Sequence, residues 1–121
     1  MKLYSLFPTE LWEEENKTID NEALGKIILE MEEAESTIDR SNIGGWHSHT
    51  GLVDDYRFSN VVNFVAETFR HVFLNNNYKA EMSFRIAGMW AIVNRQQHFN
   101  RTHIHDGCDW SFAYYVKAPE G

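Results

Sequence analysis

The tetrapeptide His103-Ile104-His105-Asp106 is the feature of this sequence that most directly suggests chemistry. On a β-strand, residues i and i+2 face the same side at a spacing of roughly 7 Å, so the two imidazoles could converge on one metal ion. Asp106 adds a carboxylate beside them. Two nitrogens and one carboxylate on one face of a metal, with open positions opposite, are typical of non-haem Fe(II) sites. The alternative interpretation is two half-exposed histidines beside a turn, with no metal.

A second His-x-His pair, His47 and His49, lies in the glycine-rich stretch 44–51. It could add a ligand or line the mouth of a site, or it could form a wide turn with solvated histidines. Arginine can bind a carboxylate through two parallel hydrogen bonds, but it is also a common surface residue of strands and loops. The arginines that could hold an acidic ligand in this way are Arg85, Arg95 and Arg101.

Tyr114 and Tyr115 are predicted to point to opposite faces of one strand, so that one phenol could reach into a cavity while the other packs outward. Cys108 is the single cysteine of the chain, which excludes an intramolecular disulfide framework. It is expected to be a small residue in a turn, and a reducing, cytoplasmic location is the simplest interpretation.

Two helices are predicted ahead of these residues. Asp20 is a suitable N-cap, and apolar residues recur at helical spacing over 23–31. Asp54 or Asp55 marks the start of a second helix. Its apolar stripe, from Phe58 to Phe73, is expected to be buried along its whole length.

Strands are predicted in the second half of the chain. Alternation of inward and outward residues over 82–93 predicts a long strand with a bend at Gly88, and alternation over 110–117 predicts another. Residues 103–105 are predicted at the end or edge of a further strand. Helices first and strands last, without regular β-α-β alternation, predict an α+β fold.

Composition excludes several classes of protein. The 121 residues are 43% hydrophobic and 24% charged, as in a single soluble domain rather than a disordered chain. No apolar run approaches the ~18 residues of a membrane span, and no signal peptide is recognisable. Residues 1–55 hold 13 acidic and four basic residues, which argues against nucleic acid as the main partner.

Several segments, in the same order along the chain, resemble a family of 2-oxoglutarate/Fe(II)-dependent oxygenases found in marine bacteria and phages. The matching segments begin with Leu6-Phe7-Pro8-Thr9-Glu10-Leu11-Trp12 and Gly44-Gly45-Trp46-His47-Ser48. They continue with Met89-Trp90-Ala91-Ile92-Val93-Asn94-Arg95, Asn100-Arg101-Thr102-His103-Ile104-His105 and Tyr114-Tyr115-Val116-Lys117-Ala118-Pro119.

The resemblance implies a double-stranded β-helix of the prolyl-hydroxylase kind, a cupin-like jelly roll, with residues 1–78 as a helical buttress and 79–121 as early strands. It implies His103 as the first Fe(II) ligand and leaves His105 and Asp106 open as the second. Binding of the 2-oxoglutarate co-substrate would involve Tyr114, Tyr115 and Arg101.

The same resemblance implies a longer oxygenase domain, because no residue here matches the family's distal histidine or its basic 2-oxoglutarate-binding residue. A jelly roll with only its early strands has open edges, so we expect a homodimer or higher oligomer formed through the C-terminal strands. Two functions stay open: a dioxygenase of unknown substrate, completed by further residues or a partner chain, and a non-catalytic, self-associating module with adventitious metal or none.

Overall fold

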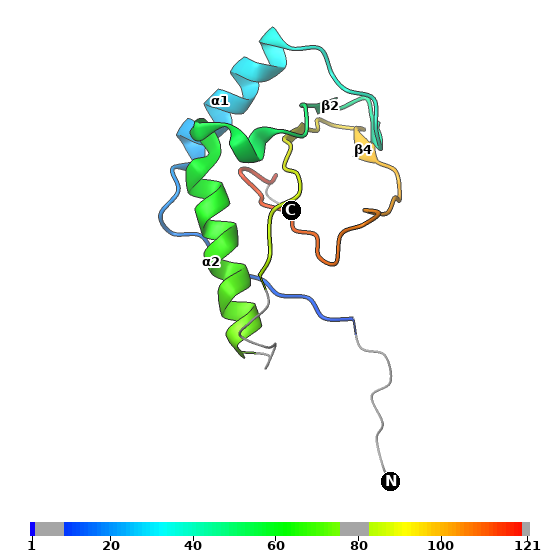
Figure 1. Ribbon diagram of the computed structural model, residues 1–121. Helices are drawn as coiled ribbons and strands as arrows, with labels where there is room; N and C mark the ends of the chain where they lie inside the picture. Colours follow the sequence, from blue (N-terminus) through cyan, green and yellow to red (C-terminus); the bar gives the residue numbers. More distant parts are fainter. Residues whose placement is uncertain (2–8, 76–82, 120–121) are drawn as a thin grey trace.

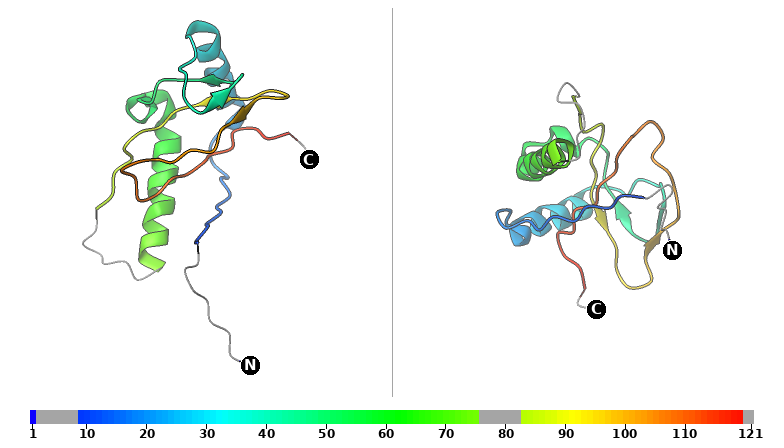
Figure 2. Two further views of the ribbon diagram at one scale, coloured as in Figure 1. Left: turned by 90° about the vertical axis from the view of Figure 1, so that its right-hand side faces the viewer. Right: turned by 90° about the horizontal axis from the view of Figure 1, so that it is seen from below.

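The computed structural model describes residues 1, 9–75 and 83–119 (Figure 1). Two helices, α1 (Asn21–Ala34) and α2 (Ser59–Asn75), lie on one side of the molecule, and the extended segments lie on the other (Figure 2). The combination of helices with small antiparallel sheets confirms the predicted α+β class.

Helix α1 begins where the sequence predicts. The Asp20 carboxylate accepts a hydrogen bond from the backbone N–H of Ala23 at 3.0 Å, which satisfies one of the free donors of the first turn. Leu24 and Met31, seven residues apart on one face, are 5% and 3% exposed. The apolar stripe therefore faces the core along the helix.

Helix α2 begins later than predicted. Residues Leu52–Asp54 and Tyr56–Phe58 form two 3-10 turns, and the Asp55 carboxylate caps the second by accepting from the Arg57 N–H at 3.0 Å. The α-helix starts at Ser59, directly after this 3-10 turn, as is frequent at helix N-termini. Helix α2 is described up to Asn75, and residues 76–82 lie outside the described residues.

The stripe on α2 is buried in its first half only. Val61 and Val65 are each 5% exposed, whereas Phe69 and Phe73 are partly exposed. Burial along the whole stripe was therefore a wrong prediction. The second half instead meets other aromatic rings: Phe69 and Phe73 each contact Phe84 and Trp110 at centroid distances between 5.7 and 6.4 Å.

Two short sheets replace the long strands that the sequence predicts. Strand β1 (Asn42–Ile43) pairs antiparallel with β4 (Phe99–Asn100), and β2 (Trp46–His47) pairs antiparallel with β3 (Ile92–Val93). Gly44 and Gly45 of the glycine-rich stretch thus lie between two strands, β1 and β2.

Neither long predicted strand is present as such. Within the described residues of 82–93, only Ile92–Val93 is strand, and Met89 makes an isolated parallel bridge with Gly51. Residues 103–105 and 110–117 are coil, with a bend at Val116, and have no strand pairing among the described residues. Alternating side chains show which face is apolar, but a strand also needs a hydrogen-bonded neighbour, and that neighbour is a property of the whole fold. The jelly roll remains a prediction.

The core lies between the helices and the β2–β3 sheet. Its buried apolar residues are Leu24, Met31, Trp46, Leu52, Phe58, Val61, Val65, Met89 and Ala91. The glycine-rich stretch that carries His47 therefore belongs to the core, and this fixes one part of the candidate site.

Candidate functional site

The fold brings the two His-x-His motifs to the same tryptophan. The imidazole of His47 stacks on the indole of Trp90 with 5.7 Å between centroids and 13° between planes. The imidazole of His105 stacks on the same indole at 5.5 Å and 12°. No local sequence pattern shows that Trp90 meets these rings, because they come from distant parts of the chain.

The backbone around Trp90 fixes the position of its indole. The N–H of Ser48 donates to the Ala91 carbonyl and the N–H of Ala91 donates to the Ser48 hydroxyl, both at 3.0 Å. One step earlier, the Met89 N–H donates to the Thr50 carbonyl at 3.0 Å. Because bonds on both sides of Trp90 hold the main chain, the side chain projects in one defined direction.

His47 is part of this rigid framework. It is 3% exposed, and its backbone N–H donates to the Thr37 hydroxyl at 3.0 Å. Its Nδ1 lies 2.6 Å from the Ser48 carbonyl, which can only accept, so Nδ1 carries the proton. The buried ring is thus held in one tautomer and supports Trp90 from below the surface.

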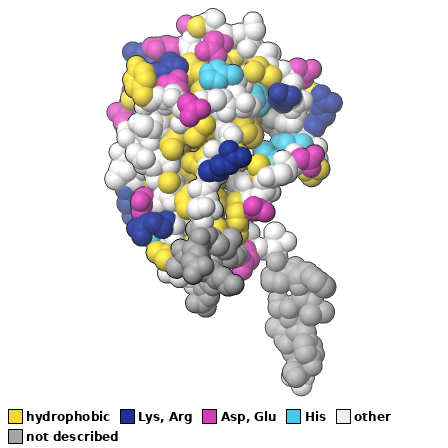
Figure 3. All heavy atoms as spheres, in the orientation of Figure 1, with side chains coloured by type: hydrophobic (Ala, Val, Ile, Leu, Met, Phe, Trp, Pro, Cys, Tyr) yellow, Lys and Arg dark blue, Asp and Glu magenta, His cyan; other side chains and the backbone are white. Residues whose placement is uncertain are grey.

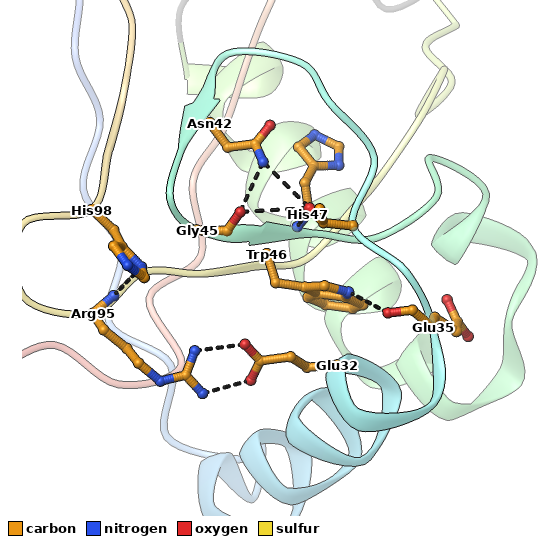
Figure 4. Close-up of polar contacts among 9 residues, drawn as sticks. Glu32, Glu35, Asn42, Gly45, Trp46, His47, Arg95 and His98 are labelled. Carbon is orange, nitrogen blue, oxygen red and sulfur yellow. Dashed lines mark hydrogen bonds and ion pairs between the residues drawn. The ribbon is translucent and has the colours of Figure 1, made fainter.

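The turn before His47 depends on two glycines and Asn42 (Figure 4). Gly44 has φ +77°, in the left-handed region that favours glycine, and a Cβ on Gly45 would collide with the Asn94 side chain. The buried Asn42 amide donates to the Gly45 carbonyl at 2.8 Å. These contacts hold β1 against β2 and set the start of the His47 segment.

His103 and His105 form an exposed pair. Their ring centroids are 5.0 Å apart with 44° between planes. Nδ1 of His103 lies 2.7 Å from the Arg101 carbonyl and must therefore donate its proton there, which leaves Nε2 with a free lone pair. A ring fixed in this way by a backbone carbonyl is the usual arrangement of a metal-binding histidine.

Asp106 lies in the turn that follows, where the Cys108 N–H donates to the His105 carbonyl at 3.2 Å and Gly107 has φ +78°. In the described part of the chain, no three side chains of His, Cys, Asp or Glu are close enough together to hold a metal ion. The structure thus brings the predicted ligands His103 and His105 together as a pair, without assembling a three-ligand group around them. Cys108 is an exposed turn residue.

The residues predicted for the co-substrate lie in three different places. The Tyr114 hydroxyl donates to Asn21 Oδ1 at 2.6 Å and accepts from Asn16 Nδ2 at 2.8 Å, so it joins the start of α1 to the segment before it. Tyr115 is 76% exposed. Only Arg101, whose carbonyl holds His103, lies beside the histidine pair.

One of the candidate carboxylate-binding arginines binds a carboxylate of the protein itself. Arg95 donates from both terminal nitrogens to the two oxygens of Glu32, at 2.6 and 2.7 Å (Figure 4). This hydrogen-bonded guanidinium holds the pKa of the Glu32 carboxyl below its ordinary value, and the carboxylate raises the pKa of Arg95. Arg95 therefore links the β3–β4 connection to α1.

A separate cleft of about 380 Å³ lies between α2 and the segment before α1. Its lining residues are Thr18, Ile19, Asn60, Asn63, Phe64 and Glu67. The lining contains no histidine, so this cleft does not coincide with the predicted metal ligands.

Comparison with known proteins gives no match: no protein-family model, no curated protein and no solved structure is similar to this chain. Across the described residues, no helix combines the length and the apolar character needed to cross a lipid bilayer.

Proposed function

We propose that this chain carries the paired histidine ligands, His103 and His105, of a 2-oxoglutarate/Fe(II)-dependent dioxygenase site. The observation that supports the proposal most strongly is the geometry of the pair. A metal–nitrogen bond to histidine is about 2.1 Å long, so imidazoles with centroids 5.0 Å apart are within reach of one ion. The structure contributes this support through geometry, while the reaction type rests on the sequence resemblance.

The protein's own residues would do two things at this site. The Arg101 carbonyl keeps the Nε2 lone pair of His103 available, and Trp90 holds the plane of the His105 ring by stacking. When bound, Fe(II) and 2-oxoglutarate supply oxidative hydroxylation chemistry. Asp106, next to the pair, is the alternative second ligand.

His103 and His105 could fill two of the coordination positions of one metal ion. A complete oxygenase site needs a third protein ligand and a basic group for the co-substrate carboxylate. Since the described residues place no third ligand beside the pair, we propose that the remaining groups come from other residues, including those of a partner chain.

The second candidate is a non-catalytic module that self-associates. The observation that favours it is the same lack, in the described part of the chain, of a third ligand beside His103 and His105. Under this alternative the histidines bind metal weakly or not at all.

An anaerobic calorimetric titration with Fe(II), with and without 2-oxoglutarate, separates the two candidates. For the dioxygenase we expect binding that 2-oxoglutarate strengthens, and a loss of affinity of at least 10-fold in His103→Ala and in His105→Ala. His71→Ala removes an exposed histidine of α2 and should leave binding unchanged. Binding that 2-oxoglutarate does not alter, or that His71→Ala weakens equally, would overturn the proposal and favour the module.

A further inference from the structure

The C-terminal segment 111–117 has the side-chain pattern of a strand but, within the described residues, no strand partner. Tyr114 and Val116 are partly buried against the helices, and the outward residues Ala113, Tyr115 and Lys117 are exposed. Among the described residues, the main chain of 111–117 makes no backbone–backbone hydrogen bond. The segment is coil with a bend at Val116, and it runs close to α1 (Figure 2).

Such a segment is a template for pairing. A row of free N–H and C=O groups with an apolar inner face accepts another extended chain by edge addition. Apolar side chains also remain at the surface here: Phe112 is 39% exposed and Tyr115 is 76% exposed. Yellow side chains reach the surface in the middle of the face shown in Figure 3.

The charges at the two ends of the segment indicate which chain would pair with it. Asp109 precedes it and Lys117 closes it, and both are exposed. Within the described residues, the structure gives neither of them an ion-pair partner. An antiparallel copy of the same segment offers the opposite charge at each end.

We propose that two copies of this chain form a symmetric dimer by antiparallel pairing of residues 109–117, with the two-fold axis at Ala113. In this register Asp109 lies opposite Lys117 of the second copy, and the same pair recurs at the other end. Ala113, the smallest side chain of the segment, faces its own copy at the axis. Opposite charges directly across an antiparallel pair stabilise it, and like charges destabilise it.

The inner face of this register is also self-complementary. Trp110 lies opposite Val116, and Phe112 lies opposite Tyr114, so aromatic and β-branched residues meet across the strands. Moving the axis by one residue, to Phe112 or Tyr114, separates Asp109 from Lys117. It would also place an aromatic ring opposite its own copy, so both faces favour the register centred on Ala113.

Disulfide crosslinking tests the register directly. In a Cys108→Ser background, Ala113→Cys places two thiols across the axis, where paired strands have Cα atoms about 4.5–5.5 Å apart, within reach of a disulfide. Lys117→Cys is the matched control, because eight residues separate it from its own copy, or ~27 Å along the strands. We expect oxidation to convert Ala113→Cys into a dimer of twice the 14.2 kDa chain, and to leave Lys117→Cys monomeric. Equal crosslinking of the two, or none at Ala113→Cys, would overturn the proposal.

A charge exchange provides a second test without cysteine. By sedimentation equilibrium, Asp109→Lys and Lys117→Asp should each raise the dimer dissociation constant about 5-fold or more, and the double variant should return it close to the wild-type value. A wild-type chain that is monomeric at micromolar concentration, or single variants that dimerise as well as wild type, would overturn the proposal. Both tests run without metal and so are independent of the proposed iron site.

Discussion

The first histidines of the two His-x-His motifs, His47 and His103, lie in opposite surroundings, although the second histidines, His49 and His105, are both exposed. His47 is 3% exposed, sits on a paired strand and has a fixed tautomer. His103 and His105 are exposed, on a segment without strand pairing. The spacing of the histidines therefore does not decide their role. The ring of His47 packs in the interior, whereas the nitrogens of the exposed pair stay accessible to a ligand.

The same contrast extends to the segments that carry the motifs. Residues 46–52 are bonded to 89–93 by strand and bridge contacts, and most of their side chains are buried. Residues 101–109 are all exposed; the Arg101 N–H donates to the Ser41 carbonyl at 2.8 Å, and His105 stacks on Trp90. Local stability therefore decreases from the first motif to the second, as is common for segments that bind ligands or partners.

The largest expected effect is on the free energy of unfolding, and it differs between variants in the two segments. Leu52, 1% exposed, lies three residues after His49, and Ile104, 80% exposed, lies between His103 and His105. Leu52→Ala should lower the free energy of unfolding by about 2–5 kcal/mol, because it leaves a cavity in the core. Ile104→Ala should change it by less than about 0.5 kcal/mol. Urea denaturation of both variants measures the difference.

Similar losses of unfolding free energy in the two variants would contradict this difference between the segments, since they would place Ile104 in a packed environment. A third variant, Leu29→Ala on α1, controls for the loss of an exposed leucine, because that side chain is 47% exposed. It should behave like Ile104→Ala.

The sequence predicts those parts of the fold that depend on local physics. The Asp20 cap and the helical spacing after it locate α1, and the apolar stripe locates α2. The strand predictions are wrong because pairing partners lie far apart in the chain. For example, β1 pairs with β4 across more than 50 residues. At the site, the pattern found the pair His103 and His105, but stacking on Trp90 is visible only after folding.

The second prediction concerns the connection between the two regions, which runs through Trp90. Trp90→Leu removes both stacking contacts, so we expect a loss of about 1–3 kcal/mol in the free energy of unfolding. If His103 and His105 bind metal, their affinity for Fe(II) should also decrease about 10-fold or more, because His105 loses its orientation.

Trp90→Phe keeps an aromatic face and should recover most of the affinity. Trp46→Phe is the matched control, because that indole is buried in the core and donates to the Glu35 carbonyl at 3.0 Å. It should lower stability without a selective loss of metal affinity. Equal affinity in Trp90→Leu and wild type would show that the exposed pair is oriented without the indole.

The smallest expected effect belongs to the ion pair between Glu32 and Arg95. The folded-state pKa of Glu32 is below its ordinary value of 4.5, chiefly through the hydrogen bonds from Arg95. The pair therefore stabilises the folded state above about pH 4.5, and this contribution is lost as the pH falls through the lower folded-state pKa.

At pH 7, Glu32→Gln should lower Tm by no more than a few degrees, since a pair at the surface contributes little. Thermal unfolding at pH 7 and pH 3 should show a smaller difference between Glu32→Gln and wild type at the lower pH. Glu33→Gln, an exposed neighbour on the same helix turn, controls for the loss of one carboxylate from α1. A difference for Glu32→Gln that is as large at pH 3 as at pH 7 would mean that side-chain packing, rather than charge, holds the β3–β4 connection to α1.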